Sequence, residues 1–160
     1  RDGISLGLRP VQKSGIPVWM AASAEKPQRR MLKIGDGWFP NSTSPKAFAE
    51  GWQQIEALAK ESGDDAGRLH KALYTTLNIN EDKAQADKEM REFIEGYYNT
   101  PFETMSRTQS VFTGNVKEAT AWLKSFIDVG VQTIVIRFAG PNQASQLELC
   151  GKEVLPQLRG

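Results

Sequence analysis

The stretch TIVIRF, residues 133–138, is the clearest strand in this sequence, because it is a short apolar run rich in β-branched residues. A helix is expected directly before it. Asn115 as N-cap and Glu118 three residues later resemble a capping box, and Gly130 ends the helix. Another helix is expected after the strand, before Pro156. The segment therefore predicts a buried strand between two helices.

The same alternation continues toward the N-terminus. Three more strands are predicted, a buried one at 16–22, a very short one at 38–40 and an alternating one at 73–79. Helical patterns separate them at 24–34, 44–62 and 86–97, and the unpatterned residues 101–114 are expected to form a loop or an insertion. Four strand and helix pairs predict an α/β fold with a parallel sheet. An open doubly wound sheet and half of an eight-stranded barrel both fit this pattern.

Composition limits the possible functions. The chain has 160 residues with 20 basic and 19 acidic side chains, which is typical of a single domain over residues 1–160. A net charge of +1 disfavours binding to nucleic acid, and no apolar run reaches membrane-spanning length. The single cysteine, Cys150, fits a reducing compartment, so a cytoplasmic location is expected. With His70 as the only histidine, a metal site or a Cys/His nucleophile pair is not expected.

In both α/β architectures ligands bind at the carboxyl ends of strands and at the following helix N-termini. The turn at 21–24 has small side chains and the Ser23 hydroxyl ahead of a helix, which suits a phosphate. Arg29 and Arg30 lie further along that helix and could add charge. From the residues alone, a turn that serves only packing is the favoured interpretation, since neither a Walker loop nor a GxGxxG pattern is present.

For the other candidate ligand-binding residues, a structural role explains the sequence at least as well as a ligand does. The acid in Gly35-Asp36-Gly37 fits a turn, and Gly114-Asn115 fits a helix cap better than an anion site. Arg137 at the end of its strand either lines a ligand cleft or pairs with a carboxylate, and both remain open. His70 is expected in a solvated loop. The four tryptophans are expected in the core, at positions 19, 38, 52 and 122.

Several segments together resemble one family. PVWMAAS (17–23), GDGWFP (35–40), GNVKEA (114–119), DVGVQTIVIRF (128–138) and EVLP (153–156) are similar to the C-terminal half of luciferase-like monooxygenases. This family includes deazaflavin-dependent dehydrogenases and reductases. The resemblance implies a TIM (β/α)8 barrel of which this chain supplies strands five to eight, with flanking helices. Those strands would be residues 16–22, 37–40, 73–79 and 133–138.

The resemblance also implies a site. In relatives the turn after the fifth strand holds the phosphate of FMN or of the deazaflavin coenzyme F-420, which here implicates Ala22, Ser23, Ala24, Lys26 and Pro27. Relatives with a phosphorylated substrate place basic residues in later loops. In this sequence Asn41 and Gln109 stand at comparable places, and Arg107 lies near them.

The catalytic side chains of the family come from the first four strands, so the catalytic residues of the parent enzyme, which acts on a small molecule, are unknown here. Because the sequence begins with Arg1 and a barrel typically needs ~250 residues, the chain is expected to be an inactive fragment of an oxidoreductase or monooxygenase. The alternative is a non-catalytic α/β module for binding or assembly. Exposed sheet edges predict self-association as a homo-oligomer in either case.

Overall fold

The computed structural model describes residue 7 and residues 10–158. Every strand pair in this part of the chain is parallel, and at least one helix connects each strand to the next. The elements follow in the order β1 (Trp19–Met20), α1 (Glu25–Ile34), β2 (Gly37–Trp38), α2 (Pro45–Ser62), the 3₁₀ turn η1 (Ala66–Arg68), β3 (His70–Ile79), α3 (Lys83–Tyr98), α4 (Phe102–Met105), β4 (Val111–Gly114), α5 (Val116–Asp128), β5 (Thr133–Phe138), α6 (Gln143–Leu149), the π-helical turn η2 (Cys150–Val154) and α7 (Leu155–Leu158).

β3 is the centre of the sheet, and both of its edges are paired. The N–H groups of His70 and Thr76 donate to the carbonyls of Asp36 and Ser110, so the segments of β2 and β4 lie one after the other along the same edge. The carbonyl of Lys71 accepts from the other side, where β5 pairs along most of the strand. Successive residues of a strand direct their N–H and C=O groups to opposite edges, so β2 and β4 share one edge of β3 while β5 pairs with the other.

The prediction that residues 101–114 form only a loop or an insertion is wrong. That segment contains the short helix α4 as well as β4. Its strand of four residues is too short to give a clear pattern in the sequence. It forms because β3 extends beyond the end of β2 and leaves a stretch of edge that β4 covers. Within the described part of the chain the sheet therefore has five strands instead of the four predicted.

The first two strands are shorter than predicted. Residues 16–22 were expected to be a buried strand, but only Trp19 and Met20 form β1, and Ile16 and Val18 are 68% and 50% exposed. Pro17 cannot donate a hydrogen bond, and among the described strands β1 pairs only with β2, which is itself two residues long. The strand predicted at 37–40 is reduced to Gly37–Trp38, since Pro40 has no N–H with which to extend the pairing.

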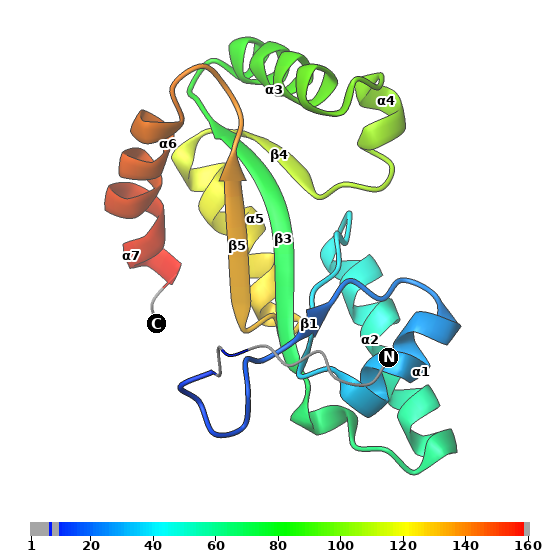
Figure 1. Ribbon diagram of the computed structural model, residues 1–160. Coiled ribbons are helices and arrows are strands. Elements are labelled where there is room, and N and C mark those ends of the chain that lie inside the picture. The colour runs from blue at the N-terminus through cyan, green and yellow to red at the C-terminus, as the bar shows by residue number, and fades with distance from the viewer. Residues whose placement is uncertain (1–6, 8–9, 159–160) are drawn as a thin grey trace.

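The two larger core clusters lie between the sheet and the helices α1, α2 and α5. Leu77 of β3 packs in one buried cluster with Leu123 of α5, and Leu73 packs in another with Phe126. In Figure 1, α5 runs behind β3 and β5, while α3 and α4 lie beyond the end toward which β5 points. Two predictions are confirmed here without change. The TIVIRF strand has the predicted bounds, and Asn115 and Glu118 form the complete capping box.

The sequence predicts that the last helix ends before Pro156. In the structure the helix continues past this residue. Its path from α6 to α7 is continuous through the π-helical turn η2, in which the N–H of Leu155 donates to the carbonyl of Cys150. Proline within a helix lacks an N–H and crowds the carbonyl four residues earlier. A wider turn directly before the proline relieves this crowding, so the helix continues past it.

Candidate functional site

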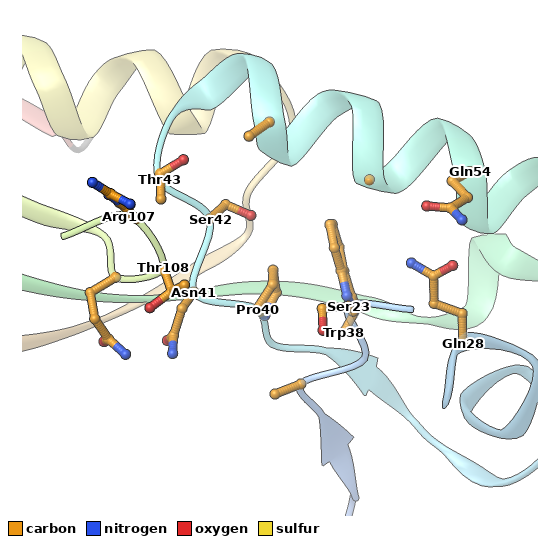
Figure 2. Close-up of a pocket in the computed structure, with 14 residues that line it drawn as sticks. Ser23, Gln28, Trp38, Pro40, Asn41, Ser42, Thr43, Gln54, Arg107 and Thr108 are labelled. Carbon is orange, nitrogen blue, oxygen red and sulfur yellow. The ribbon is translucent and has the colours of Figure 1, made fainter. Parts of the chain in front are cut away.

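A cleft of about 470 Å³ opens where β1 and β2 end. The β1 to α1 turn, the loop after β2, the first half of α2 and the segment 107–109 form its walls (Figure 2). Most of its lining side chains are polar or small. They belong to Ala21, Ser23, Gln28, Trp38, Pro40, Asn41, Ser42, Thr43, Ala47, Gly51, Gln54, Arg107, Thr108 and Gln109. This is the edge of a parallel sheet at which α/β proteins bind ligands.

Trp38 fixes the turn at one wall of the cleft. Its indole Nε1–H donates to the carbonyl oxygen of Ala22 at 2.8 Å, and its ring packs against Phe48 with 4.8 Å between centroids. Gly51 of α2 makes room for this ring, because a Cβ at that position would lie 2.7 Å from Trp38. The buried indole therefore holds the backbone between β1 and α1 in a defined position.

The N-terminus of α1 has no side-chain cap. Ala24 is the N-cap in an extended conformation, and its methyl group cannot accept a hydrogen bond. The N–H groups of Glu25 and Lys26 therefore have no partner within the helix, whereas Pro27 has no N–H. Unpaired N–H groups at the positive end of a helix form a favourable environment for an anion.

Only some of the residues implicated by the family resemblance line the cleft. Ser23 is exposed and lines the cleft, and Ala22 is buried behind it with its carbonyl bonded to Trp38. Ala24 forms the cap at the start of α1. Lys26 and Pro27 lie in the first turn of α1, exposed, and do not line the cleft.

The later loops bring three more residues to the same cleft. Asn41, Arg107 and Gln109 all line it together with Ser23, although they are far apart in the sequence. Among the lining residues Arg107 carries the only positive charge. Arg29 does not contribute its positive charge to the cleft. It binds Glu25 and Glu61 at 2.8 and 2.6 Å, and the bond to Glu61 is the main cause that raises the Arg29 pKa.

Gln28 and Gln54 are cleft residues that the sequence analysis missed. Gln28 belongs to α1 and is 1% exposed, whereas Gln54 lies on α2 and is exposed. Figure 2 shows the two side chains facing each other at one end of the cleft, with Arg107 at the other end. A sequence signal for Gln28 existed, because it precedes the buried Met31 and Leu32 by one helical turn.

Two other candidate sites have the structural role that was favoured. The carboxylate of Asp36 accepts a hydrogen bond from the N–H of Val18 at 2.8 Å, so it stabilises the turn between α1 and β2. The side chain of Asn115 accepts from the N–H of Glu118 at 2.9 Å, and the Glu118 carboxylate accepts from the N–H of Asn115. Asn115 is therefore a helix cap.

The prediction that His70 is a solvated loop residue is wrong. His70 is the first residue of β3 and half-buried, with Nε2 2.8 Å from Oγ1 of Thr133. Its ring stacks on Trp19 with 4.9 Å between centroids. Trp19 in turn is 37% exposed, so the prediction that all four tryptophans are core residues holds for Trp38 but not for Trp19. The pairing of β3 with β5 places His70 beside Thr133, which local sequence does not reveal.

Arg137 lies among aromatic rings, so neither of its two proposed roles is needed to explain it. Its Nη2 and Nε donate to Oγ1 of Thr76 at 2.9 and 3.1 Å, and its Nη1 donates to the hydroxyl of Tyr98 at 3.3 Å. The guanidinium also lies 4.9 to 5.5 Å from the centroids of four rings, which belong to Tyr74, Phe93, Tyr97 and Tyr98. Three of these rings come from α3. Arg137 therefore attaches α3 to the sheet.

The described residues contain no group of three or more histidine, cysteine or acidic side chains arranged to hold a metal ion. Cys150 is buried, and this burial raises the pKa of its thiol, which disfavours the reactive thiolate. Within residue 7 and residues 10–158, no helix combines the length and the apolar composition that crossing a bilayer requires.

The parallel sheet with connecting helices and the cleft at its carboxyl edge define an α/β protein with a candidate ligand site at the strand ends. Comparison with known families is more specific. The chain belongs to the luciferase-like monooxygenase family, whose model matches residues 2–128. The family resemblance noted in the sequence is thereby confirmed.

Curated relatives include two 5,10-methylenetetrahydromethanopterin reductases. The enzyme of Methanopyrus kandleri is 25% identical over 94% of this chain and 53% of its own length. The enzyme of Archaeoglobus fulgidus is 20% identical over 99% of this chain and 58% of its own length. This chain therefore spans little more than half the length of these relatives.

Solved structures support the fold. An F420-dependent secondary alcohol dehydrogenase in complex with an F420-acetone adduct matches with a TM-score of 0.74 and 14% identity, over 92% of this chain and half of that one. The coenzyme F420 dependent tetrahydromethanopterin reductase of Methanopyrus kandleri matches with a TM-score of 0.69 and 22% identity, over 94% of this chain and 53% of that one. The sheet is a parallel half-barrel like those of its luciferase-like neighbours.

Proposed function

We propose that this chain is the C-terminal part of a flavin- or deazaflavin-dependent oxidoreductase and supplies the side of the site that binds the cofactor phosphate. In this proposal residues 1–160 form one domain that corresponds to barrel strands five to eight of the parent enzyme. The chain alone is inactive, because the catalytic residues belong to the missing half. FMN and coenzyme F-420 are both compatible with the proposal, and the parent acts on a small-molecule substrate.

The observation that carries the proposal is the uncapped start of α1 beside the cleft. Ser23 lines the cleft directly before this helix, and the N–H groups of Glu25 and Lys26 are left without helical partners. In the proposal the turn from Ala22 to Pro27 holds the phosphate through the backbone N–H groups of Glu25 and Lys26, and the Ser23 hydroxyl adds one donor. Relatives named as F420-dependent enzymes support this choice of ligand.

The residues of this chain fit the phosphate end of a phosphorylated cofactor. The cleft, about 470 Å³ in volume, has room for a phosphate and the chain attached to it, and the N–H groups of Glu25 and Lys26 have no partner within α1. When bound, a flavin or deazaflavin ring supplies hydride or electron transfer. The role of this chain is to bind and orient the phosphate end, and Arg107 extends the positive side of the cleft.

Replacing Ser23 with aspartate tests the phosphate turn. We expect the 160-residue chain to bind FMN or the deazaflavin, and we expect Ser23→Asp to weaken that binding at least about tenfold, because a carboxylate then faces the phosphate. Binding is followed by fluorescence titration with each cofactor. Ser14→Asp is a matched control, since Ser14 is exposed and lies outside the cleft.

Comparison of the two aspartate variants separates a general effect of added negative charge from a specific effect at Ser23. Equal loss of binding in both aspartate variants would indicate a general charge effect and not a site at Ser23. If the unaltered chain binds neither cofactor, the proposal fails.

Assembly through sheet edges is a second candidate function, favoured by the apolar side chains exposed near those edges. Among the described strands β5 pairs only with β3, and Val135 on it is 39% exposed. At the other end of the sheet β1 pairs only with β2, and Trp19 on it is also exposed. Open strand edges pair with other chains when nothing covers them. We therefore propose that the chain forms homo-oligomers.

Light scattering over a wide range of protein concentrations measures this association. We expect a mass above that of the 17.8 kDa monomer and a decrease toward it in Val135→Lys, because a lysine on an edge strand opposes pairing. Val11→Lys is the control, as Val11 is fully exposed outside the sheet. A chain that stays monomeric at the highest concentration contradicts the edge argument.

A further inference from the structure

A second cleft, with a volume of about 500 Å³, lies between α3 and β4. Met90 of α3, Phe102 of α4 and Val111 of β4 line it and belong to one apolar cluster, so its floor is apolar. Charged side chains of α3, among them Lys88 and Arg91, form its rim. None of these residues lines the cleft at the ends of β1 and β2, so the two clefts are separate.

A free strand edge opens into this second cleft. The carbonyl of Gly114 accepts from the N–H of Asn80, which follows β3, so the even-numbered residues of β4 direct their backbone groups toward β3. Because successive residues alternate, the N–H and C=O groups of Val111 and Thr113 point to the opposite edge. Both residues line the cleft and are only half-buried, and these four backbone groups have no hydrogen-bond partner among the described residues.

An extended peptide is the kind of partner that such an edge fits. Along a strand the outward backbone groups recur every second residue, about 6.8 Å apart, which is also the repeat of a neighbouring strand. An added strand can therefore pair with all four groups of Val111 and Thr113 at once, while its alternate side chains enter the adjoining cleft.

α3 covers one face of β4 and limits which partner can approach. Lys83 of α3 donates to the Thr113 hydroxyl at 2.9 Å and pairs with Asp87, and Val111 packs in the cluster of Met90. A second copy that paired antiparallel through its own β4 would bring its α3 to this same face, because a two-fold axis perpendicular to the sheet relates such strands. The two helices would then compete for one space, and a peptide without such a helix avoids this conflict.

The charges at the rim favour an acidic partner. The carboxylate that lines the cleft is already paired with Lys83, and Arg91 binds Glu103 at 2.6 Å. Lys88 has the weakest partner of the two lining cations, since its Nζ lies 3.9 Å from Glu92 and both side chains are more than half exposed. A carboxylate on the partner can therefore pair with Lys88.

We propose that the free edge of β4 binds an extended peptide segment by strand addition. The peptide backbone pairs with Val111 and Thr113, its alternate apolar side chains lie over Met90 and Phe102, and a flanking acidic side chain pairs with Lys88. This surface lies apart from the proposed cofactor turn and from the edges of β1 and β5, so the inference does not rest on the proposed function.

A synthetic peptide tests the inference on the 160-residue protein. Acetyl-Glu-Val-Ser-Val-Ser-Val-Glu-amide has its apolar side chains on one face when extended and an acid at each end. Binding is measured from the NMR shifts of the Val111 and Thr113 amides. We expect a dissociation constant below about 1 mM, and binding about threefold to tenfold weaker when lysine replaces both glutamates. If neither amide shifts with the glutamate peptide, the inference is overturned.

N-methylated versions of this peptide show whether its backbone pairs with β4. The N–H groups of successive residues in an extended strand point to opposite edges, so methyl groups on the valine nitrogens and on the serine nitrogens block different edges. We expect one of these two peptides to bind at least about tenfold more weakly than the parent peptide and the other to bind nearly as well. Equal affinities of the two methylated peptides contradict strand addition.

Lys88→Glu tests the acidic part of the partner. We expect this variant to prefer the lysine-flanked peptide by about threefold to tenfold, which reverses the preference of the unaltered protein. Lys46→Glu is the matched control, because Lys46 is also loosely paired within a helix, 3.7 Å from Glu50, and lies outside this cleft. If Lys88→Glu keeps the original preference as Lys46→Glu does, the acidic partner is refuted.

Val111→Pro removes one outward donor. An edge strand tolerates proline where its nitrogen faces away from the neighbouring strand, so β4 should stay paired with β3 and the unfolding midpoint should fall by no more than about 4 °C. We expect the glutamate peptide to bind about threefold to tenfold more weakly. Unchanged affinity in the folded variant overturns the pairing at Val111, and if the variant does not fold, the methylated peptides decide the question.

Light scattering tests a second copy as the occupant of this edge. We expect Val111→Pro to have the same mass as the unaltered protein at every concentration. A lower mass in the variant, together with no peptide binding by the unaltered protein, assigns the β4 edge to a second copy and overturns the inference. Titration with FMN or the deazaflavin is a separate measurement, so failure of the proposed cofactor site is distinguishable from failure at β4.

Discussion

Trp38→Ala is expected to lower the free energy of unfolding by about 3–5 kcal/mol, the usual range for truncating a large buried aromatic side chain. Trp38 is 3% exposed and packs against Phe48. The same substitution removes the indole N–H that binds the Ala22 carbonyl. We therefore expect the turn before α1 to lose its defined position and cofactor binding to be lost as well.

Urea denaturation measures the stability change, and two further variants separate its causes. Trp38→Phe keeps most of the packing but leaves the Ala22 carbonyl without its partner, so it should cost about 1–3 kcal/mol. Trp19→Ala should cost less than Trp38→Ala because Trp19 is far more exposed. A Trp38→Ala protein as stable as Trp19→Ala would contradict the central place assigned to this indole.

Arg137→Met is expected to lower the free energy of unfolding by about 2–3 kcal/mol and to loosen α3. The guanidinium donates to Thr76, which is fully buried, and to Tyr98 at the end of α3. Hydrogen bonds from a charged group and contacts between a cation and partly desolvated rings each contribute on this order. Methionine keeps much of the side-chain length but lacks the charge and the donors.

Denaturation and hydrogen exchange of the α3 amides test this role. Arg137→Lys should recover part of the stability, since lysine keeps the charge but not the planar set of donors. Arg30→Met replaces an exposed arginine of α1 and should change little. If the α3 amides exchange as slowly in Arg137→Met as in the unaltered chain, Arg137 does not attach this helix.

Local sequence was sufficient to predict β5 and the start of α5. β-branched residues over 133–138 predicted β5, and the residues at 115 and 118 predicted the start of α5, because strand propensity and capping depend on neighbours in the chain. β4 could not be predicted in this way. Its four residues form a strand only because the upper part of the β3 edge is free to pair with them.

By itself the sequence determined the alternation of strands and helices, the parallel sheet and the family, since these depend on periodicity and on motifs that local residues carry. Only the tertiary structure decided which side chains meet in the cleft. Ser23, Asn41 and Arg107 come from separate loops that the parallel strands bring to one edge. Burial of the Gln28 oxygen likewise depends on how α1 packs, which is a property of the folded chain.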